Sequence, residues 1–195
     1  MPRRLRKVRP SPLLALVLVA GPAHADSWIV HGELDPFPFA TLRYGGQLGV
    51  RAPQLAGVRL ALASFSLDVP DVIGQLGGND GFHVDVRPSG ALYALYYLRP
   101  AGSDGLAVGA SLRYLRFRYT HDDAPGEDVD VSELSPEAIV GYQWHPFHNG
   151  FYLQPWLALG VALTHSADAT VGGHTYDELP VSPFFTVNIG YERAL

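Results

Sequence analysis

The segment from His83 to Ser89 holds the residue types of a nucleophilic catalytic centre. His83, Asp85 and Ser89 all stand at odd-numbered positions, and a serine activated by a histidine that a carboxylate orients is the arrangement of many hydrolases and acyltransferases. Alternate residues of one strand lie about 6.5–7 Å apart, so on a regular strand Ser89 is far from both partners. No Gly-x-Ser-x-Gly motif accompanies them. The segment is therefore a weak catalytic candidate, and polar lining is the favoured interpretation.

Five carboxylates crowd the stretch 122–130. Hard divalent cations such as Ca²⁺ bind several such oxygens, but the Pro125-Gly126 turn interrupts the spacing that an EF-hand needs. A solvated acidic loop is the favoured interpretation. His31 and His145 have no companion at ligand spacing and the chain has no Cys, so the sequence predicts no zinc site and no cofactor. The weak Ca²⁺ candidates are Asp122, Asp123, Glu127, Asp128 and Asp130.

Alternation of apolar and polar residues at every second position is the dominant pattern of the chain, and it predicts β-strands. In 133–145, for example, Val140 and Tyr142 fall on one face, and Glu137 and Gln143 fall on the other. Aromatic residues are 11% of the chain and it holds 21 Gly, which suits strands joined by tight turns. Strands are predicted at 28–34, 41–51, 57–63, 83–98, 112–119, 133–145, 153–163 and 181–193.

Two of these segments depart from a regular alternation. Leu112 is even-numbered, whereas Leu115 and Phe117 are odd-numbered, and we expect a β-bulge near Arg113 to explain the change of phase. Pro88 lies inside another predicted strand, where proline forfeits a ladder hydrogen bond. A second bulge is therefore expected at Pro88.

Each predicted strand has one strongly apolar face and one face of small, polar or charged residues. In a soluble barrel the apolar face would line the inside, whereas in a membrane barrel it meets lipid. Small residues such as Gly45 and Ala158 recur on the second face and fit a crowded lumen. Buried charges persist when paired, and an eight-stranded lumen is narrow, so ion pairs are expected to fill it, with a small gated conduit as the alternative. The predicted lumen network is Arg43, Arg59, Asp85, Arg87 and Glu137.

Short and long connections alternate along the chain. Segments 51–57, 99–105 and 146–150 are short, and 68–81, 121–130 and 165–179 are longer and polar. Membrane barrels place short turns on the periplasmic side and long loops outside. This alternation makes 28–34 the first outward strand and gives eight strands, with both termini in the periplasm.

The first 25 residues have the parts of a cleavable signal peptide. Basic residues at 3–9 precede a short apolar stretch at 13–20, and Ala23-His24-Ala25 supplies the cleavage site. We expect residues 1–25 to be removed and 26–195 to form one barrel domain. Nine arginines and all 19 acidic residues then remain, a net charge of −10. Such an acidic surface argues against nucleic acid as a partner.

These strands resemble those of the eight-stranded outer-membrane barrel families typified by outer-membrane proteins A, X and W. The resemblance covers 28–195 and depends on the alternation, the signal peptide and the aromatic residues near strand ends. It implies a monomer in a Gram-negative outer membrane that contacts outer-membrane lipids, lipopolysaccharide and the barrel assembly machinery. The expected aromatic girdle is Tyr44, Tyr93, Tyr96, Tyr97, Tyr142, Trp144, Phe151, Tyr152, Phe185 and Tyr191.

Three functions follow from these observations as hypotheses. The first is a non-enzymatic barrel with a structural, adhesive or porin-like small-solute role. The second is a lipid A-modifying hydrolase or acyltransferase, because such enzymes occur on the architecture that this sequence resembles. The third is a soluble periplasmic ligand-binding barrel with an apolar interior. The weak catalytic pattern favours the first.

Overall fold

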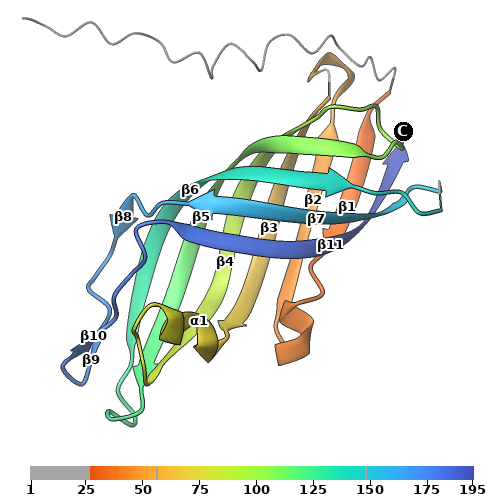
Figure 1. Cartoon of the computed structure of the whole chain (residues 1–195). Coiled ribbons are helices and arrows are strands. Elements are labelled where there is room, and N and C mark those ends of the chain that lie inside the picture. Colours follow the sequence, from red (N-terminus) through yellow and green to blue (C-terminus); the bar gives the residue numbers. More distant parts are fainter. Residues whose placement is uncertain (1–26, 56, 148) are drawn as a thin grey trace, which may run out of the picture.

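A computed structural model describes residues 27–195 except 56 and 148; the expected signal peptide lies outside this part of the chain. Eight strands form the body of the molecule (Figure 1). Each pairs antiparallel with the next along the chain, and the last pairs with the first, so the sheet closes. The strands are β1 (Ile29–Leu34), β2 (Tyr44–Arg51), β3 (Val58–Val69), β4 (Phe82–Tyr97), β5 (Gly105–His121), β6 (Val129–Gln143), β7 (Phe151–Gly160) and β11 (Ser182–Ala194).

The fold is therefore an eight-stranded antiparallel up-and-down β-barrel, as the alternation predicted. Ile29 pairs with Ala194, so the first and last strands start and end at the same end of the barrel. Short connections lie at that end; one carries η4 (Pro53–Leu55) and another turns at Gly150, whose φ of 91° suits glycine. The other end carries η3 (Pro38–Thr41), α1 (Asp71–Leu76) and the short strands β8 (Thr164–His165), β9 (Thr170–Val171) and β10 (His174–Thr175).

The two faces of the strands differ in polarity as a membrane barrel requires. Outward-facing Leu48 and Leu62 are 73% and 65% exposed, whereas inward-facing Arg59 and Gln154 are each 1% exposed. Leucine on the outside and arginine on the inside is the polarity of a transmembrane barrel. The alternative of a soluble barrel with an apolar interior is therefore wrong. In the part of the chain that the structure describes, no helix has the length and apolarity needed to cross a membrane.

β4, β5 and β6 are the long strands, with 16, 17 and 15 residues. About 9–11 residues suffice to cross a bilayer, and these strands extend past the others at the end of the barrel away from the chain termini, which we call the outer end (Figure 1). There the polarity inverts, and Phe82, Val84, Tyr119 and Val131 form a buried cluster on the inside. The inversion has a simple cause, because a strand that leaves lipid has water on its outer face.

This inversion explains the phase change that the sequence shows after Leu112. β5 pairs with β6 without any register shift from Gly105 to Tyr119, so the predicted bulge near Arg113 is wrong. Leu115 and Arg113 both face inward on a regular strand. The residue type on the inner face changes because the surroundings of the strand change, and the backbone does not.

The predicted bulge at Pro88 is confirmed. The pairing of β4 with β5 shifts between Val86 and Gly90, which moves Ser89 inward and leaves His83 exposed. The girdle prediction was partly wrong, because Tyr93, Tyr97 and Tyr152 are buried inside the barrel. Other members are exposed, namely Tyr44, Tyr142, Trp144, Phe185 and Tyr191.

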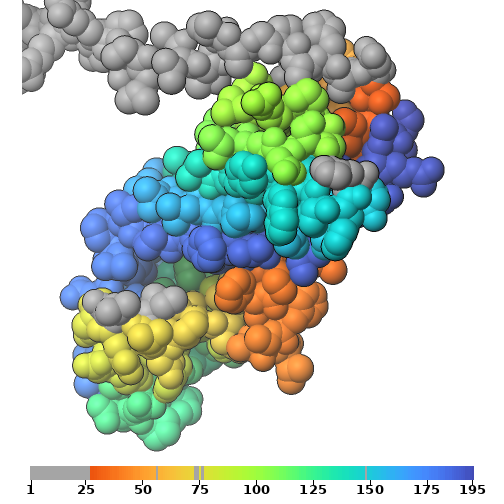
Figure 2. All heavy atoms as spheres, turned by 45° about the vertical axis from the view of Figure 1, so that its right-hand side comes forward, coloured from red at the N-terminus to blue at the C-terminus, as the bar shows by residue number. Residues whose placement is uncertain are grey.

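The projecting strand ends are covered by what we call the outer cap: α1, the β5–β6 connection and the segment 161–181. Figure 2 shows α1 (yellow) beside the β5–β6 connection (green to cyan). The ring of Tyr176 packs edge-on against Phe82, 5.4 Å between centroids. Asn79 exchanges two hydrogen bonds with the backbone of Asp177, of 2.9 and 2.6 Å. The cap is therefore an ordered structure joined to the barrel by packing and by hydrogen bonds.

Candidate functional site

The polar lumen of the barrel is the candidate site, and its middle is organised around Glu33. The inward phase of β1 places this carboxylate among four neighbouring strands, at 3% exposure. Arg59 forms an ion pair with it, and the Tyr152 hydroxyl donates a hydrogen bond of 2.6 Å. The amides of Gln47 and Asn188 donate to its second oxygen. Glu33 thus accepts from β2, β3, β7 and β11, and links strands around the lumen.

A second ion pair lies nearer the outer cap. Arg113 of β5 pairs with Glu137 of β6, and the Ser111 hydroxyl donates to the same carboxylate at 2.6 Å. The Arg113 guanidinium also lies 5.0 Å from the ring centre of Phe65 and 4.9 Å from that of Phe184. The pair is therefore enclosed by aromatic side chains, which strengthens the attraction between its charges.

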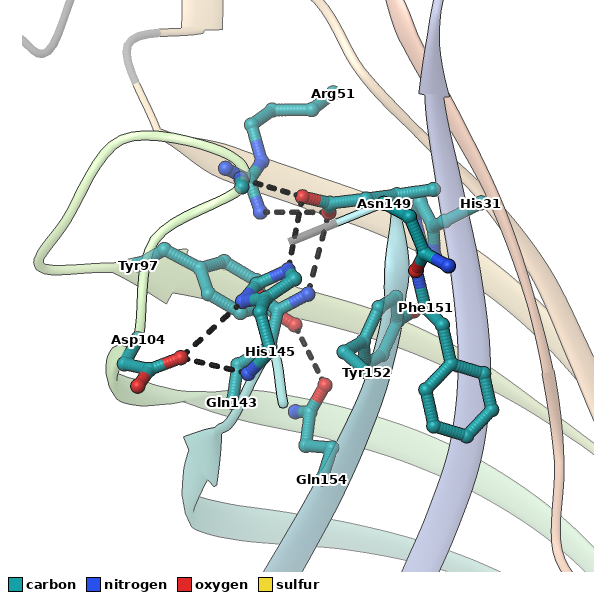
Figure 3. Close-up of polar contacts among 12 residues, drawn as sticks. His31, Arg51, Tyr97, Asp104, Gln143, His145, Asn149, Phe151, Tyr152 and Gln154 are labelled. Atoms are coloured by element: carbon teal, nitrogen blue, oxygen red, sulfur yellow. Dashed lines mark hydrogen bonds and ion pairs between the residues drawn. The ribbon is translucent and has the colours of Figure 1, made fainter. Parts of the chain in front are cut away.

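A third cluster closes the end that carries the chain termini (Figure 3). Glu192 of β11 lies 3.9 Å from Arg51 and 3.2 Å from Nε2 of His145. Gln143 donates to it at 3.2 Å. The backbone N–H of His145 donates to Asp104 at 2.6 Å, and thus joins the β4–β5 connection to the cluster. The side chains of this cluster come from separate strands and turns and meet at Glu192.

The three clusters share one composition. Each contains one buried arginine and one buried glutamate, and none of these six residues is more than 8% exposed. The register between strands places the layers at different levels of the lumen. Glu137 of the second pair is level with Gly160, at one end of β7, whereas Tyr152 of the Glu33 layer lies near the other end of β7, level with Gly190. The formal charge of each pair is zero, which is the condition under which ionised groups can remain in a lumen.

The predicted lumen network is only partly brought together. Arg59 and Glu137 lie in the lumen, in different layers. Arg43 lies outside β2, because the 3₁₀ helix η3 (Pro38–Thr41) comes first and the strand begins only at Tyr44. It binds Asp68 at 2.7 Å and Asp85 at 3.4 Å near the outer rim, with about a third of each side chain exposed. Arg87 also lies outside the three layers, in the Pro88 bulge.

The predicted lumen charge network did not include Glu33, Glu192 or Arg51. Glu33 and His31 both face inward from β1. The alternation of apolar and polar residues that assigned Glu137 to the lumen could have assigned these two residues to it as well. Glu192 follows the inward phase of β11 in the same way. For Glu33, the missing step was to assign faces to the first strand as well as to the later ones.

The weak catalytic candidates do not form a triad. His83 lies between two aspartates, with Nδ1 3.0 Å from Asp71 and Nε2 2.9 Å from Asp122. Ser89 donates to the backbone carbonyl of Arg87 at 2.7 Å and accepts from a backbone N–H. The serine and the histidine are thus held by other partners, and the bulge places them on opposite faces of β4.

The acidic residues of the β5–β6 connection also have separate partners. Asp128 and Asp130 both bind Arg118, at 2.9 Å, and this guanidinium lowers the pKa of Asp130. Asp122 binds His83, and Glu127 is exposed. The carboxylates do not converge on one point, so the geometry favours the solvated loop over a calcium site.

A recess in the lumen is lined by Arg113 of the second ion pair and by Gln47 and Asn188, which bind Glu33. It encloses about 400 Å³ including open solvent. Its walls include the aromatic rings of Phe65, Tyr93, Trp156 and Phe184, and Asp35 lies at its edge. Little of this volume is enclosed, so the recess is smaller than a formed ligand pocket.

No protein-family model and no curated protein matches this sequence. Two solved structures are similar in shape. Neisserial surface protein A (NspA) matches with a TM-score of 0.49 and 11% identity, over 86% of this chain and 97% of that one. A major outer membrane protein from Thermus thermophilus matches with a TM-score of 0.45 and 14% identity, over 86% of this chain and 98% of that one. The closed pairing of its own strands shows that this chain is an eight-stranded antiparallel barrel.

Proposed function

We propose that this chain is a non-conducting barrel of a Gram-negative outer membrane, with a structural role. Its lumen is closed by the three arginine–glutamate layers, its termini face the periplasm and its outer cap faces the outside of the cell. The observation that carries this proposal is the buried Glu33 carboxylate, which binds Arg59 and three further side chains across the lumen.

The energetics of the lumen support closure over conduction. A solute that crosses must separate the Arg59–Glu33 pair and the two pairs on either side of it. Separating a buried pair leaves uncompensated charge, which costs about 3–5 kcal/mol for one partner. An eight-stranded barrel has just enough interior for side chains. The structural role is therefore better supported than the small-solute role.

The location is supported by the sequence and by the barrel exterior. Residues 1–25 have the pattern of a signal peptide, and the outside of the barrel carries leucines that water would not favour. Such a surface fits outer-membrane lipids and lipopolysaccharide, and insertion would require the barrel assembly machinery. A closed sheet has no free edge to pair with another chain, which favours a monomer.

Fractionation and conductance together test the proposal. We expect the protein in the detergent-extracted outer membrane, with a gel mobility that shifts on boiling, and no unitary conductance in planar bilayers. A conducting porin reconstituted in the same bilayers is the control that shows a current can be detected. Recovery in the soluble periplasm would overturn the location, and stable channels from the unmodified protein would overturn the closed lumen.

A further inference from the structure

Three potential metal ligands gather in the outer cap. Glu133 stands at the outer end of β6 and pairs in register with His165 of β8. Glu178 lies in the segment before β11, with its carboxylate 3.2 Å from Nδ1 of His165. One ligand atom of each residue lies within 4.8 Å of the other two. Residues far apart in the sequence thus converge on one point.

Among the described residues, the two carboxylates at this point have between them a single basic partner within 4.0 Å, His165. Glu133 is 8% exposed. Within the described residues, no arginine or lysine nitrogen lies within 4.0 Å of the carboxylate of Glu133 or Glu178, whereas each lumen glutamate has its own arginine. Two neighbouring carboxylates repel one another, and a buried carboxylate without a cation is costly. The arrangement therefore calls for a cation from solution.

The donor set indicates which cation. Calcium and magnesium bind oxygen ligands, whereas an imidazole nitrogen favours zinc and related transition metals. Three protein ligands of the His/Glu type, with one position left for water, form an open zinc site. His165 and Glu178 have about a third of their side chains exposed, so an ion can enter from solvent.

A second group of ligand atoms in the cap is less suited to a metal. The rings of His121 and His174 stack 3.9 Å apart with an interplanar angle of 6°. Imidazole lone pairs lie in the ring plane, so two parallel stacked rings do not aim at one ion. Nδ1 of His121 also accepts a hydrogen bond of 3.1 Å from the backbone of Asp123. This group serves better as a control than as a site.

We propose that Glu133, His165 and Glu178 bind one Zn²⁺ ion, which fastens the segment 161–181 to the outer end of β6. Glu133 belongs to the barrel wall, whereas both other ligands belong to the covering segment, so the ion acts as a cross-link between them. The site lies in the cap and is independent of whether the lumen conducts.

The test is metal titration of the full-length protein purified in detergent. We expect one Zn²⁺ per chain by calorimetry, and a visible absorption band when Co²⁺ replaces it. Glu133→Gln, His165→Asn and Glu178→Gln should each weaken binding by more than about tenfold, since even the loss of an outer-shell partner costs that much. His174→Asn, a matched change to another exposed cap histidine, should bind as the unmodified protein does.

Two results would overturn the zinc site. One is the absence of saturable Zn²⁺ binding by the unmodified protein. The other is equal binding by the unmodified protein and the three ligand variants, each shown to be folded by its mobility shift on boiling. His165 and Glu178 lie on the surface of the cap, so their substitutions leave the barrel wall intact. A current through the lumen would refute closure but would leave this test unchanged.

Discussion

At the scale of single residues, the lumen is defined by pairing across strands. Arg59 of β3 reaches Glu33 of β1, so the pair spans an intervening strand. The Tyr152 hydroxyl, from β7, meets the same carboxylate. A carboxylate with several donors holds its charge in the lumen without water. Loss of one donor therefore affects several strands at once.

Arg59→Ala should lower the heat stability of the folded barrel substantially. It leaves Glu33 buried without its cation, a change that costs about 3–5 kcal/mol in other buried pairs. Glu137→Ala should act in the same direction, because it strands Arg113. The temperature at which the folded gel band is lost measures both. Arg116→Ala, at an exposed position, is the control, and equal melting of all three variants and the parent would contradict the filled lumen.

His83 should make the attachment of α1 depend on pH. Hydrogen bonds with Asp122 and Asp71 raise the pKa of His83 above its ordinary value of 6.5. The protonated form is thus favoured in the folded protein, so its stabilising effect is complete below pH 6.5 and is lost as pH rises through the raised pKa. Cleavage of the 70–81 segment by a protease should be faster at about pH 8.5 than at about pH 5.5, relative to an unstructured substrate. His83→Gln should remove the difference, and a variant that keeps it would refute this role.

At the scale of elements, the projecting ends of β4, β5 and β6 behave as a small water-soluble sheet. Their inner face is apolar and is covered by Ala169, Val171 and Tyr176 of the segment 161–181. The tip of this segment is a hairpin in which β9 pairs with β10, and Gly172 and Gly173 of its turn both have positive φ. The cap is thus stabilised by burial of apolar side chains and the barrel by its closed ladder, so the two can loosen separately.

Asn79→Ala should loosen the cap and leave the barrel intact. It removes both hydrogen bonds to the backbone of Asp177, each worth about 0.5–1.5 kcal/mol. Limited proteolysis should then cut 161–181 faster, with no change in the melting of the barrel. Asp177→Asn is the matched control, since the bonds use its backbone. Equal protection of the two variants would show that Asn79 does not hold the segment.

At the scale of the whole molecule, the apolar exterior and charged interior require lipid around the barrel. Leu62 faces outward from the middle of β3, whereas Leu42, 96% exposed, lies in the connection before β2. Both are exposed leucines, but only Leu62 stands at bilayer depth in a membrane barrel. Substituting each leucine in turn therefore distinguishes the effect of lipid contact on stability from the effect of exposure alone.

Leu62→Arg should destabilise the barrel in lipid vesicles by about 2–4 kcal/mol, the cost of arginine near the midplane. Leu42→Arg should change stability by less than about 0.5 kcal/mol, as surface substitutions do. Denaturant unfolding of the barrel in vesicles measures both. Equal effects at the two positions would argue against a lipid-facing β3.

The alternation by itself determined the strand count, the antiparallel order and the inward face of strands such as 133–145, because a period of two is a local property of the chain. The bulge at Pro88 was predicted separately, from the backbone hydrogen bond that a proline cannot donate. The partners of each charge depend on the register between strands, which brings Glu33 to Arg59 and Glu192 to Arg51. Only the tertiary structure decided those pairs.

The tertiary structure also decided where the membrane ends. The change of phase after Leu112 has the same sequence pattern as a bulge, and only the unbroken register of β5 with β6, together with the burial of Leu115, shows that the backbone stays regular there. In the same way, Glu133, His165 and Glu178 share no motif. They meet because the segment 161–181 folds back onto β6, and contacts between distant segments leave no periodic trace in a sequence.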